Sequence, residues 1–343
     1  MKLTPLLLAD PSPCLRLLVL RELLGLTDDH PEVKELEQLR NEDPLIRDLN
    51  ELQAPDGSWS SKDLLDSSYT DNIRPTSMAL FRFGYLGFNS DHPSVVKGVE
   101  YLFSLQHEDG SWPIPTGKPQ KVDGGYDMIP LQTAFPLRAI ASCGYASDSR
   151  LERGYEWLLQ QRLEDGAWPA GTRAGTRGFI AGYRKLAHSQ WGCRTNTTAA
   201  LTALAHHPKR RRSKAARRAL DLLLARETKE RHVLGFEIAR IIGVEPARGY
   251  FTHHARYDVA FILNLCWRIG ASLDDDRVAE LIEFITKNQG LYGLWEYIPH
   301  PQVSRWVSFD ILRSLLHINE TSDWLSYEPR TPFQAYVKRS KRF

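Results

Sequence analysis

The chain repeats one short pattern, in which a glutamine is followed by a glycine about four residues later and then, after one more residue, by a tryptophan. Trp59, Trp112 and Trp168 are 53 and 56 residues apart, and the 127 residues between Trp168 and Trp295 leave room for one degenerate unit. Repetition at a fixed period of this length is typical of repeat architectures. The four copies are LQAPDGSW (near 53–59), LQHEDGSW (near 106–112), QQRLEDGAW (near 161–168) and NQGLYGLW (near 289–295).

Each copy separates two kinds of helical segment. Apolar residues precede the turn at spacings of three and four, as in residues 95–103, which predicts an amphipathic helix. More uniformly apolar segments follow the turns, and a helix that is apolar nearly all round must be covered on most sides. We therefore expect an all-α fold, a single (α/α)6-like barrel over residues 1–343, with six inner helices and about five outer ones. The expected inner segments are 13–26, 74–88, 129–145, 194–205, 257–270 and 305–318.

The residues of the turn itself suit a junction between helices. Glycine adopts the backbone conformation that ends a helix, and the aspartate before it in three copies favours a turn. A tryptophan can pack against the next helix while its indole N–H donates to the glutamine or to a backbone carbonyl. The repeated pattern is therefore expected to join successive units.

Composition excludes several classes of function. The formal charge is only +2, so the chain lacks the basic field that nucleic-acid binding requires, and the basic run at 206–218 is expected to be a solvated turn. Four isolated cysteines suit a reduced cytoplasmic protein. No segment approaches the roughly 18 consecutive apolar residues of a membrane span. Asp10 and two prolines interrupt the apolar start, which is therefore expected to be a capped helix and not a signal peptide.

Two copies resemble a known motif over its whole length. The segments KGVEYLFSLQHEDGSW and RGYEWLLQQRLEDGAW are similar to the QW motif of the terpenoid cyclase and prenyltransferase toroids. The resemblance covers roughly residues 40–320. Squalene cyclases, oxidosqualene cyclases, class II diterpene cyclases and protein prenyltransferase β subunits share this motif. The larger enzymes use two barrels and this chain holds one, so the resemblance implies a single-domain class II terpene cyclase of the merosterolic acid synthase type.

That resemblance implies a reaction started by an acid. In the family an aspartic acid of a DxDD motif protonates an alkene or epoxide, and this sequence has no DxDD. Asp109 is our first candidate, because it lies beside His107, Glu108 and a long loop rich in proline and glycine, and Asp127 is the second. A turn residue is the competing interpretation of Asp109. Three further aspartates are expected to act as helix caps: Asp71, Asp258 and Asp310.

Aromatic and basic residues near the starts of the inner helices are the candidate substrate contacts. Aromatic faces stabilise carbocations, and arginines near an apolar lumen would hold an anionic or phenolic headgroup. Packing in the core and surface ion pairs are the competing interpretations. The aromatic candidates are Trp191, Tyr257, Phe261, Trp306 and Phe309, and the basic candidates are Arg74 and Arg194, with Arg256 and Arg305 at equivalent places.

Two other classes of function remain open at this stage. A prenyltransferase-like protein needs a zinc site with an Asp-x-Cys pair, which Cys193 and Cys266 do not provide, and residues 274–276 lack the last aspartate of a class I DDxxD motif. A toroid that binds lipid without catalysis is the second alternative. We expect a cyclase without metal or cofactor that converts a lipophilic polyprenyl substrate, in the first place a prenylated hydroxybenzoate, to a meroterpenoid. A cytoplasmic location is expected, and peripheral membrane contact would serve substrate uptake.

Overall fold

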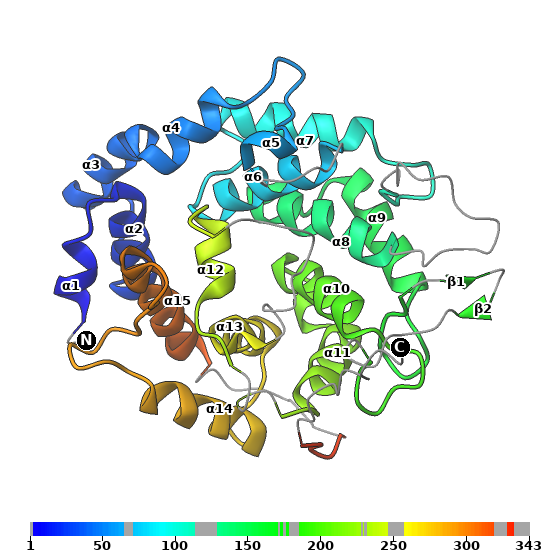
Figure 1. Ribbon diagram of the computed structural model, residues 1–343. Helices are drawn as coiled ribbons and strands as arrows, with labels where there is room; N and C mark the ends of the chain where they lie inside the picture. The colour runs from blue at the N-terminus through cyan, green and yellow to red at the C-terminus, as the bar shows by residue number, and fades with distance from the viewer. Residues whose placement is uncertain are drawn as a thin grey trace, which may run out of the picture.

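The computed structural model describes residues 3–64, 71–113, 129–170, 172–173, 176–177, 185–227, 229, 232–245, 257–318 and 328–332. Helices make up most of this part and form a ring (Figure 1). From the second inner helix onward, successive inner helices contact one another, and the last of them contacts the continuation of the first. The inner helices are α2 (Pro13–Leu18) continued by η1 (Val19–Leu23), α6 (Ile73–Tyr85), α8 (Ile129–Ile140) continued by η3 (Ala141–Tyr145), α10 (Arg194–His206), α13 (Val259–Ile269) and α15 (Ser304–His317).

The outer helices, apart from the one at residues 44–51, each pack against the inner helix that precedes them in the chain. They are α3 (Pro31–Leu39), α4 (Pro44–Glu51), α7 (Pro93–Ser104), α9 (Ser149–Gln160), α11 (Lys214–Leu224) and α14 (Asp276–Lys287). The expected all-α toroid of inner and outer helices is thus confirmed. The shorter elements are α1 (Thr4–Leu8), α5 (Ser61–Leu64), α12 (Phe236–Ile241), η2 (Arg40–Glu42), η5 (Arg210–Arg212), η8 (Pro301–Val303) and the antiparallel pair β1 (Thr172–Arg173) and β2 (Thr176–Arg177).

The tryptophan of each QW turn has two fixed polar contacts. The indole Nε1 of Trp112 donates to the carbonyl of Leu102 at 2.7 Å, and its backbone N–H donates to the Thr133 hydroxyl at the start of α8. Trp59, Trp168 and Trp295 each repeat both contacts, always to a carbonyl ten residues earlier and to a hydroxyl on the next inner helix. The indole partner is therefore a backbone carbonyl, which is one of the two partners expected.

In the first two QW turns, the glutamine and the glycine join the turn to the next outer helix. Gln106 Nε2 donates to the carbonyls of Gly110 and of Arg150, which lies in the first turn of α9. Gly110 has φ +93°, and a β-carbon there would lie 2.6 Å from the carbonyl oxygen of Arg153. On α9 itself, a β-carbon at Gly154 would lie 3.0 Å from the Trp112 ring. Glycine is therefore required both in the turn, at Gly110, and on α9, at Gly154.

Burial of these rings contributes much of the stability of the junctions. Trp59, Trp112 and Trp168 are all fully buried. A tryptophan buries roughly 150–250 Å² of surface, which corresponds to about 4–6 kcal/mol of gross hydrophobic free energy before the loss of entropy is subtracted.

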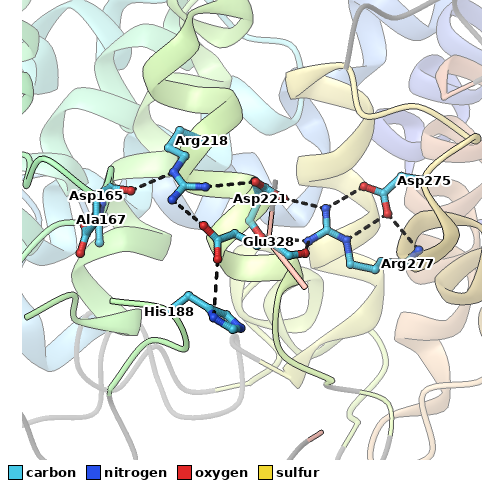
Figure 2. Close-up of polar contacts among 8 residues, drawn as sticks. All are labelled: Asp165, Ala167, His188, Arg218, Asp221, Asp275, Arg277 and Glu328. Carbon is cyan, nitrogen blue, oxygen red and sulfur yellow. Dashed lines mark hydrogen bonds and ion pairs between the residues drawn. The ribbon is translucent and has the colours of Figure 1, made fainter. Parts of the chain in front are cut away.

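The C-terminal segment ties the outer layer together at one side of the ring (Figure 2). Arg218 on α11 donates to the carbonyl of Asp165 in the third QW turn and pairs with Glu328. Asp221, also on α11, pairs with Arg277 of α14 at 2.7 Å. One polar network therefore joins the third QW turn, two outer helices and residues 328–332. Among the described residues, no helix is long and apolar enough to cross a bilayer.

We predict that Gly110→Ala destabilises the protein by about 3 kcal/mol or more, because the new methyl group meets backbone atoms and the backbone is left-handed. Gly25→Ala is the matched control, because Gly25 has φ +66° but a β-carbon there would have no other atom within 4 Å, and it should cost only about 1 kcal/mol. Urea denaturation measures both. Equal losses would show that the close approach of the turn to α9 is unimportant.

Candidate functional site

The starts of the inner helices carry aspartates at the end of the ring where the QW turns lie. Asp71 accepts from the backbone N–H of Arg74 at 3.0 Å and from its guanidinium, so it caps α6. Asp258 is the N-cap of α13 and is fully buried. Helix N-termini carry partial positive charge, and these carboxylates complement it. The cap interpretation is confirmed for both aspartates.

Asp258 also holds the short helix α12 in place. Its carboxylate accepts backbone N–H groups of Gly235 and Glu237 at 2.9 and 2.8 Å, in addition to those of Ala260 and Phe261 in its own helix. Burial raises the pKa of Asp258 to about 7, although these backbone hydrogen bonds act in the opposite direction. The carboxyl group therefore links two helices that begin at the same place.

Helix α12 lies on the inner side of the ring in Figure 1 and contacts both α6 and α15. At its start, a β-carbon on Gly235 would meet the side chain of Val307 on α15. At its end, the carbonyl of Ile241 accepts from Arg82 Nε of α6 at 2.5 Å. No QW motif follows α11, and this helix occupies the corresponding unit. The degenerate unit expected between Trp168 and Trp295 therefore contributes an outer helix, α11, followed by an additional inner segment.

Helix α12 carries two charged residues that are buried inside the ring. Glu237 accepts from Arg240 Nη1 at 2.8 Å and from Arg138 Nη1 of α8 at 3.3 Å, and all three residues are at most 1% exposed. The Arg138 guanidinium also lies 4.1 Å from the centre of the Phe81 ring. Burial of charges is costly unless they are paired, so this triad is expected to specify the position of α12.

A second buried polar cluster lies on α15. Asp310 accepts from both Asn264 Nδ2 of α13, at 3.2 and 3.3 Å, and the guanidinium of Arg313. Arg313 also pairs with Glu22 of η1 at 3.0 Å. Asp310 lies in the middle of α15, so the prediction that it caps a helix is wrong. It connects three inner helices across the interior instead.

Two of the predicted aromatic residues belong to this α15 cluster. Phe309 is fully buried, and the Arg313 guanidinium lies 5.0 Å from its ring centre. Trp306 is 4% exposed, and its ring centre is 6.3 Å from that of Tyr85 on α6. Aromatic faces and a buried carboxylate thus meet at one place inside the ring.

The structure does not support Asp109 as the acid. Asp109 is exposed in the second QW turn, where its Oδ1 accepts from the backbone N–H and the hydroxyl of Ser111 at 2.9 and 2.7 Å. Partial burial raises its pKa, but the hydrogen bonds from Ser111 outweigh that effect and the pKa is lowered overall. An exposed, readily ionised carboxyl group cannot hold a proton for a substrate inside the ring. The turn-residue interpretation is the one that the geometry favours.

Asp127 lies outside the described residues, as does Arg256. The other predicted substrate contacts are separated along the ring. Arg74 pairs with Asp71, and Arg194 is 1% exposed as the first residue of α10. Trp191 packs against Ala170 and Cys193, whereas Tyr257 and Phe261 are buried beside the start of α13. Arg305 lies 3.4 Å from Asp10.

Sequence reasoning missed Arg138, Glu237, Arg240 and Arg313. Each is a charged residue inside a short apolar run, and Asp310 and Arg313 are also three residues apart in one expected helix. Charged residues are rarely buried unless they are paired, so a charge on a helix expected to be buried all round was the available signal. Among the described residues, no group of three His, Cys, Asp or Glu side chains is placed to hold a metal ion.

Taken together, four QW turns and two layers of helices define an all-α toroid that resembles the terpenoid cyclases. Comparison with protein families agrees with this class: residues 30–189 match the squalene-hopene cyclase C-terminal domain. This match contains the first three QW turns. The resemblance to terpenoid cyclases drawn from the sequence is confirmed over that part of the chain.

Curated relatives give the same family over short alignments. The chain is 29% identical to a squalene–hopene cyclase of Zymomonas mobilis over 119 residues, which are 34% of this chain and 17% of that enzyme. It is 28% identical to a squalene–hopene cyclase of Bradyrhizobium diazoefficiens over 123 residues, 35% of this chain and 18% of the enzyme. It is also 28% identical to the lanosterol synthase of Saccharomyces cerevisiae over 131 residues, 36% and 17% of the two chains. The alignments therefore span less than a fifth of these relatives.

Two solved structures show a structural similarity to this chain at low sequence identity. A type II terpene cyclase from Scytonema in complex with geranylgeranyl dihydroxybenzoate has a TM-score of 0.48 and 14% identity, over 79% of this chain and 70% of that one. A protein from Actinoplanes has a TM-score of 0.44 and 17% identity, over 89% and 90% of the two chains.

The stability contributed by Asp258 should depend on pH. Because its pKa is raised in the folded protein, the protonated group stabilises the fold fully below about pH 4, and this contribution is lost as the pH rises to about 7. We expect the stability of the wild type relative to Asp258→Asn to fall by up to about 4 kcal/mol over that range.

Asp109→Asn is the control with the opposite sign. The pKa of Asp109 is lowered on folding, so its contribution is present above its unfolded pKa and is lost as the pH falls through the folded pKa. Denaturant titrations of the three proteins at several pH values measure both trends. If the stability difference between the wild type and Asp258→Asn did not depend on pH, burial would not raise the pKa of Asp258.

Proposed function

We propose that the chain is a class II terpene cyclase, an isomerase that closes rings in a linear polyprenyl substrate after protonating one of its double bonds. The observation that carries this proposal is the match of residues 30–189 to the squalene-hopene cyclase C-terminal domain, together with a helical ring built on QW turns. Buried aromatic side chains on inner helices, such as Trp306 and Phe309, provide faces suited to a carbocation.

The substrate and the product of this reaction have the same molecular formula. A carboxylic acid transfers its proton to one carbon of a terminal alkene, and the positive charge forms on the neighbouring, more substituted carbon. The π electrons of successive double bonds then form new C–C bonds, and the charge moves along the chain. Loss of a proton from the final cation gives an isomer of the substrate. The acid is protonated again either by solvent or by the proton that the final cation released.

Asp127 is the acid in this proposal. In the sequence it comes two residues before Ile129, the first residue of α8. Two buried aspartates on inner helices already have other partners: Asp258 accepts four backbone N–H groups, and Asp310 pairs with Arg313.

The proposed substrate is a polyprenyl chain attached to a hydroxybenzoate. Its apolar chain suits the aromatic and aliphatic inner surface, and its acidic head would require a basic residue near the start of an inner helix. Arg194 is such a residue, because it begins α10. Tyr257 and Phe261 are the proposed contacts of the chain near the start of α13.

Incubation with geranylgeranyl dihydroxybenzoate and, separately, with squalene tests the proposal. We expect a product with the mass of the substrate but fewer double bonds, identified by mass spectrometry and NMR. Asp127→Asn should lower kcat by a factor of about 10³ or more with little change in melting temperature, because amides do not protonate alkenes.

Asp109→Asn and Asp165→Asn are the control variants, since both residues are turn aspartates of QW motifs and Asp127 lies outside these motifs. Both variants should retain turnover. Full activity of Asp127→Asn would remove Asp127 as the acid, and the absence of turnover with either substrate would favour the second candidate function.

That second candidate is a toroid that binds a polyprenyl lipid without converting it. The observation in its favour is that α12 and the triad Arg138, Glu237 and Arg240 occupy part of the ring interior with charge. This alternative predicts that the lipid is bound and recovered unchanged, and the same incubation therefore distinguishes the two.

We also propose peripheral contact with a membrane, from which a lipophilic substrate would be taken up. Leu291 and Tyr292 lie in the fourth QW motif and are 100% and 80% exposed, and Ile298, three residues after the motif, is 84% exposed. The first three QW motifs have Pro-Asp, Glu-Asp and Glu-Asp at the tip, where the fourth has Leu-Tyr. Four free, buried cysteines support a cytoplasmic location for the protein.

The double variant Leu291→Ser/Ile298→Ser should reduce binding to phosphatidylcholine vesicles by about tenfold or more in a flotation assay, because it removes exposed apolar surface. Leu39→Ser is the control, since Leu39 is 42% exposed in the outer helix α3. Equal binding by the wild type and the double variant would exclude this surface as a membrane contact.

A further inference from the structure

A cleft of about 500 Å³ lies beside the start of α12, outside the residues assigned to the reaction above. One wall is residues 232–236, which lead into α12, and the other is residues 288–299, which include the fourth QW turn. Glu245, just after α12, completes it. A volume of this size suits a small organic molecule.

Both walls are held by backbone hydrogen bonds. Val233 pairs with residues 257 and 259 on either side of Asp258, at 3.0 and 3.1 Å. The N–H of Glu245 donates to the carbonyl of Ala239 at 3.1 Å, and that of Gly290 donates to Leu294 at 2.8 Å. The cleft is therefore formed before any ligand arrives, which lowers the entropy lost on binding.

The lining is mostly apolar but carries negative charge. Leu234, Phe236 and Ile298 provide apolar surface, and Glu245 and Glu296 provide two carboxylates. The lining residues within the described part of the chain include no lysine and no arginine. An anionic ligand would meet repulsion here, whereas a cation would meet opposite charge next to an aromatic ring.

Glu245 is the best-defined of these charged groups. Its side chain is 17% exposed, and its Oε1 accepts from the Tyr297 hydroxyl at 2.7 Å. Burial and this carboxylate raise the pKa of Tyr297, so the phenol stays a neutral donor. The Nε2 atom of His300 lies 3.6 Å from the same oxygen, so an imidazole of the chain already approaches this carboxylate.

We infer that this cleft binds an organic ammonium ion that has an apolar body. The apolar part would lie against Phe236 and Ile298, and the ammonium group would lie near Glu245 and the face of Tyr297. Cation–π contacts contribute about 0.5–2 kcal/mol, and a partly desolvated carboxylate adds a charge-assisted contact. This inference does not depend on the proposed cyclase reaction.

Isothermal titration calorimetry with three probes of equal chain length tests the inference on the wild-type protein. Hexyltrimethylammonium should bind, hexanol should bind more weakly, and hexanoate should bind at least about tenfold more weakly than the ammonium ion. Equal affinities for the three probes, or a preference for hexanoate, would overturn the proposal whatever the variants show.

Variants separate a direct role of Glu245 from a structural one. Glu245→Gln should weaken hexyltrimethylammonium binding about tenfold, because it removes the charge and keeps the shape. Tyr297→Phe should retain binding, because it removes only the neutral donor to that carboxylate. Equal losses of affinity in Tyr297→Phe and Glu245→Gln would show that Glu245 only holds Tyr297 in place and does not contact the ligand. That result would contradict the proposal.

Glu108→Gln is the matched control, because Glu108 is an exposed glutamate of the second QW turn and does not line the cleft. It should leave the affinity unchanged, and a loss there would mean that the ammonium probe binds through general surface charge. Melting temperatures of all variants confirm that they are folded. Unchanged affinity in a folded Glu245→Gln protein would also exclude the inferred site.

Discussion

The rest of the structure depends on the two hydrogen bonds of the QW tryptophan. The indole donates back to a carbonyl of its own outer helix, and the backbone N–H donates forward to a hydroxyl on the next inner helix. Both groups are buried, so leaving either unpaired would cost about 1–3 kcal/mol. One residue therefore fixes the distance and the angle between two layers, and repetition of that geometry closes the helices into a ring.

A ring of parallel inner helices has two electrically different ends. Aspartates lie at the starts, as Asp71 and Asp258 do, and basic residues lie in the last turns, as Arg268 and His206 do. This arrangement complements the partial charges of the helix ends. His206 is affected by its basic neighbours: burial, then Arg268, Arg138 and Arg313, lowers its pKa well below the ordinary value.

Helix α12 modifies this interior more than any other element. It replaces the junction expected between α11 and α13, and it places Glu237 between two arginines inside the ring. A cyclase needs a dry volume lined by apolar and aromatic groups, so the space available to a substrate is shaped by this helix. The same helix forms one wall of the cleft near Glu245, and its position therefore affects both proposed sites.

The sequence by itself determined the all-α class, the inner and outer helices and the role of the QW turns. These features depend on periodicity and on glycine and tryptophan at fixed spacing, which are local properties. The caps Asp71 and Asp258 were predictable for the same reason. Only the tertiary structure decided that Asp109 faces solvent, that Asp310 pairs with Arg313, and that α12 enters the ring. Those outcomes depend on which residues far apart in the chain meet, and a buried charge is stable only where such a partner is placed beside it.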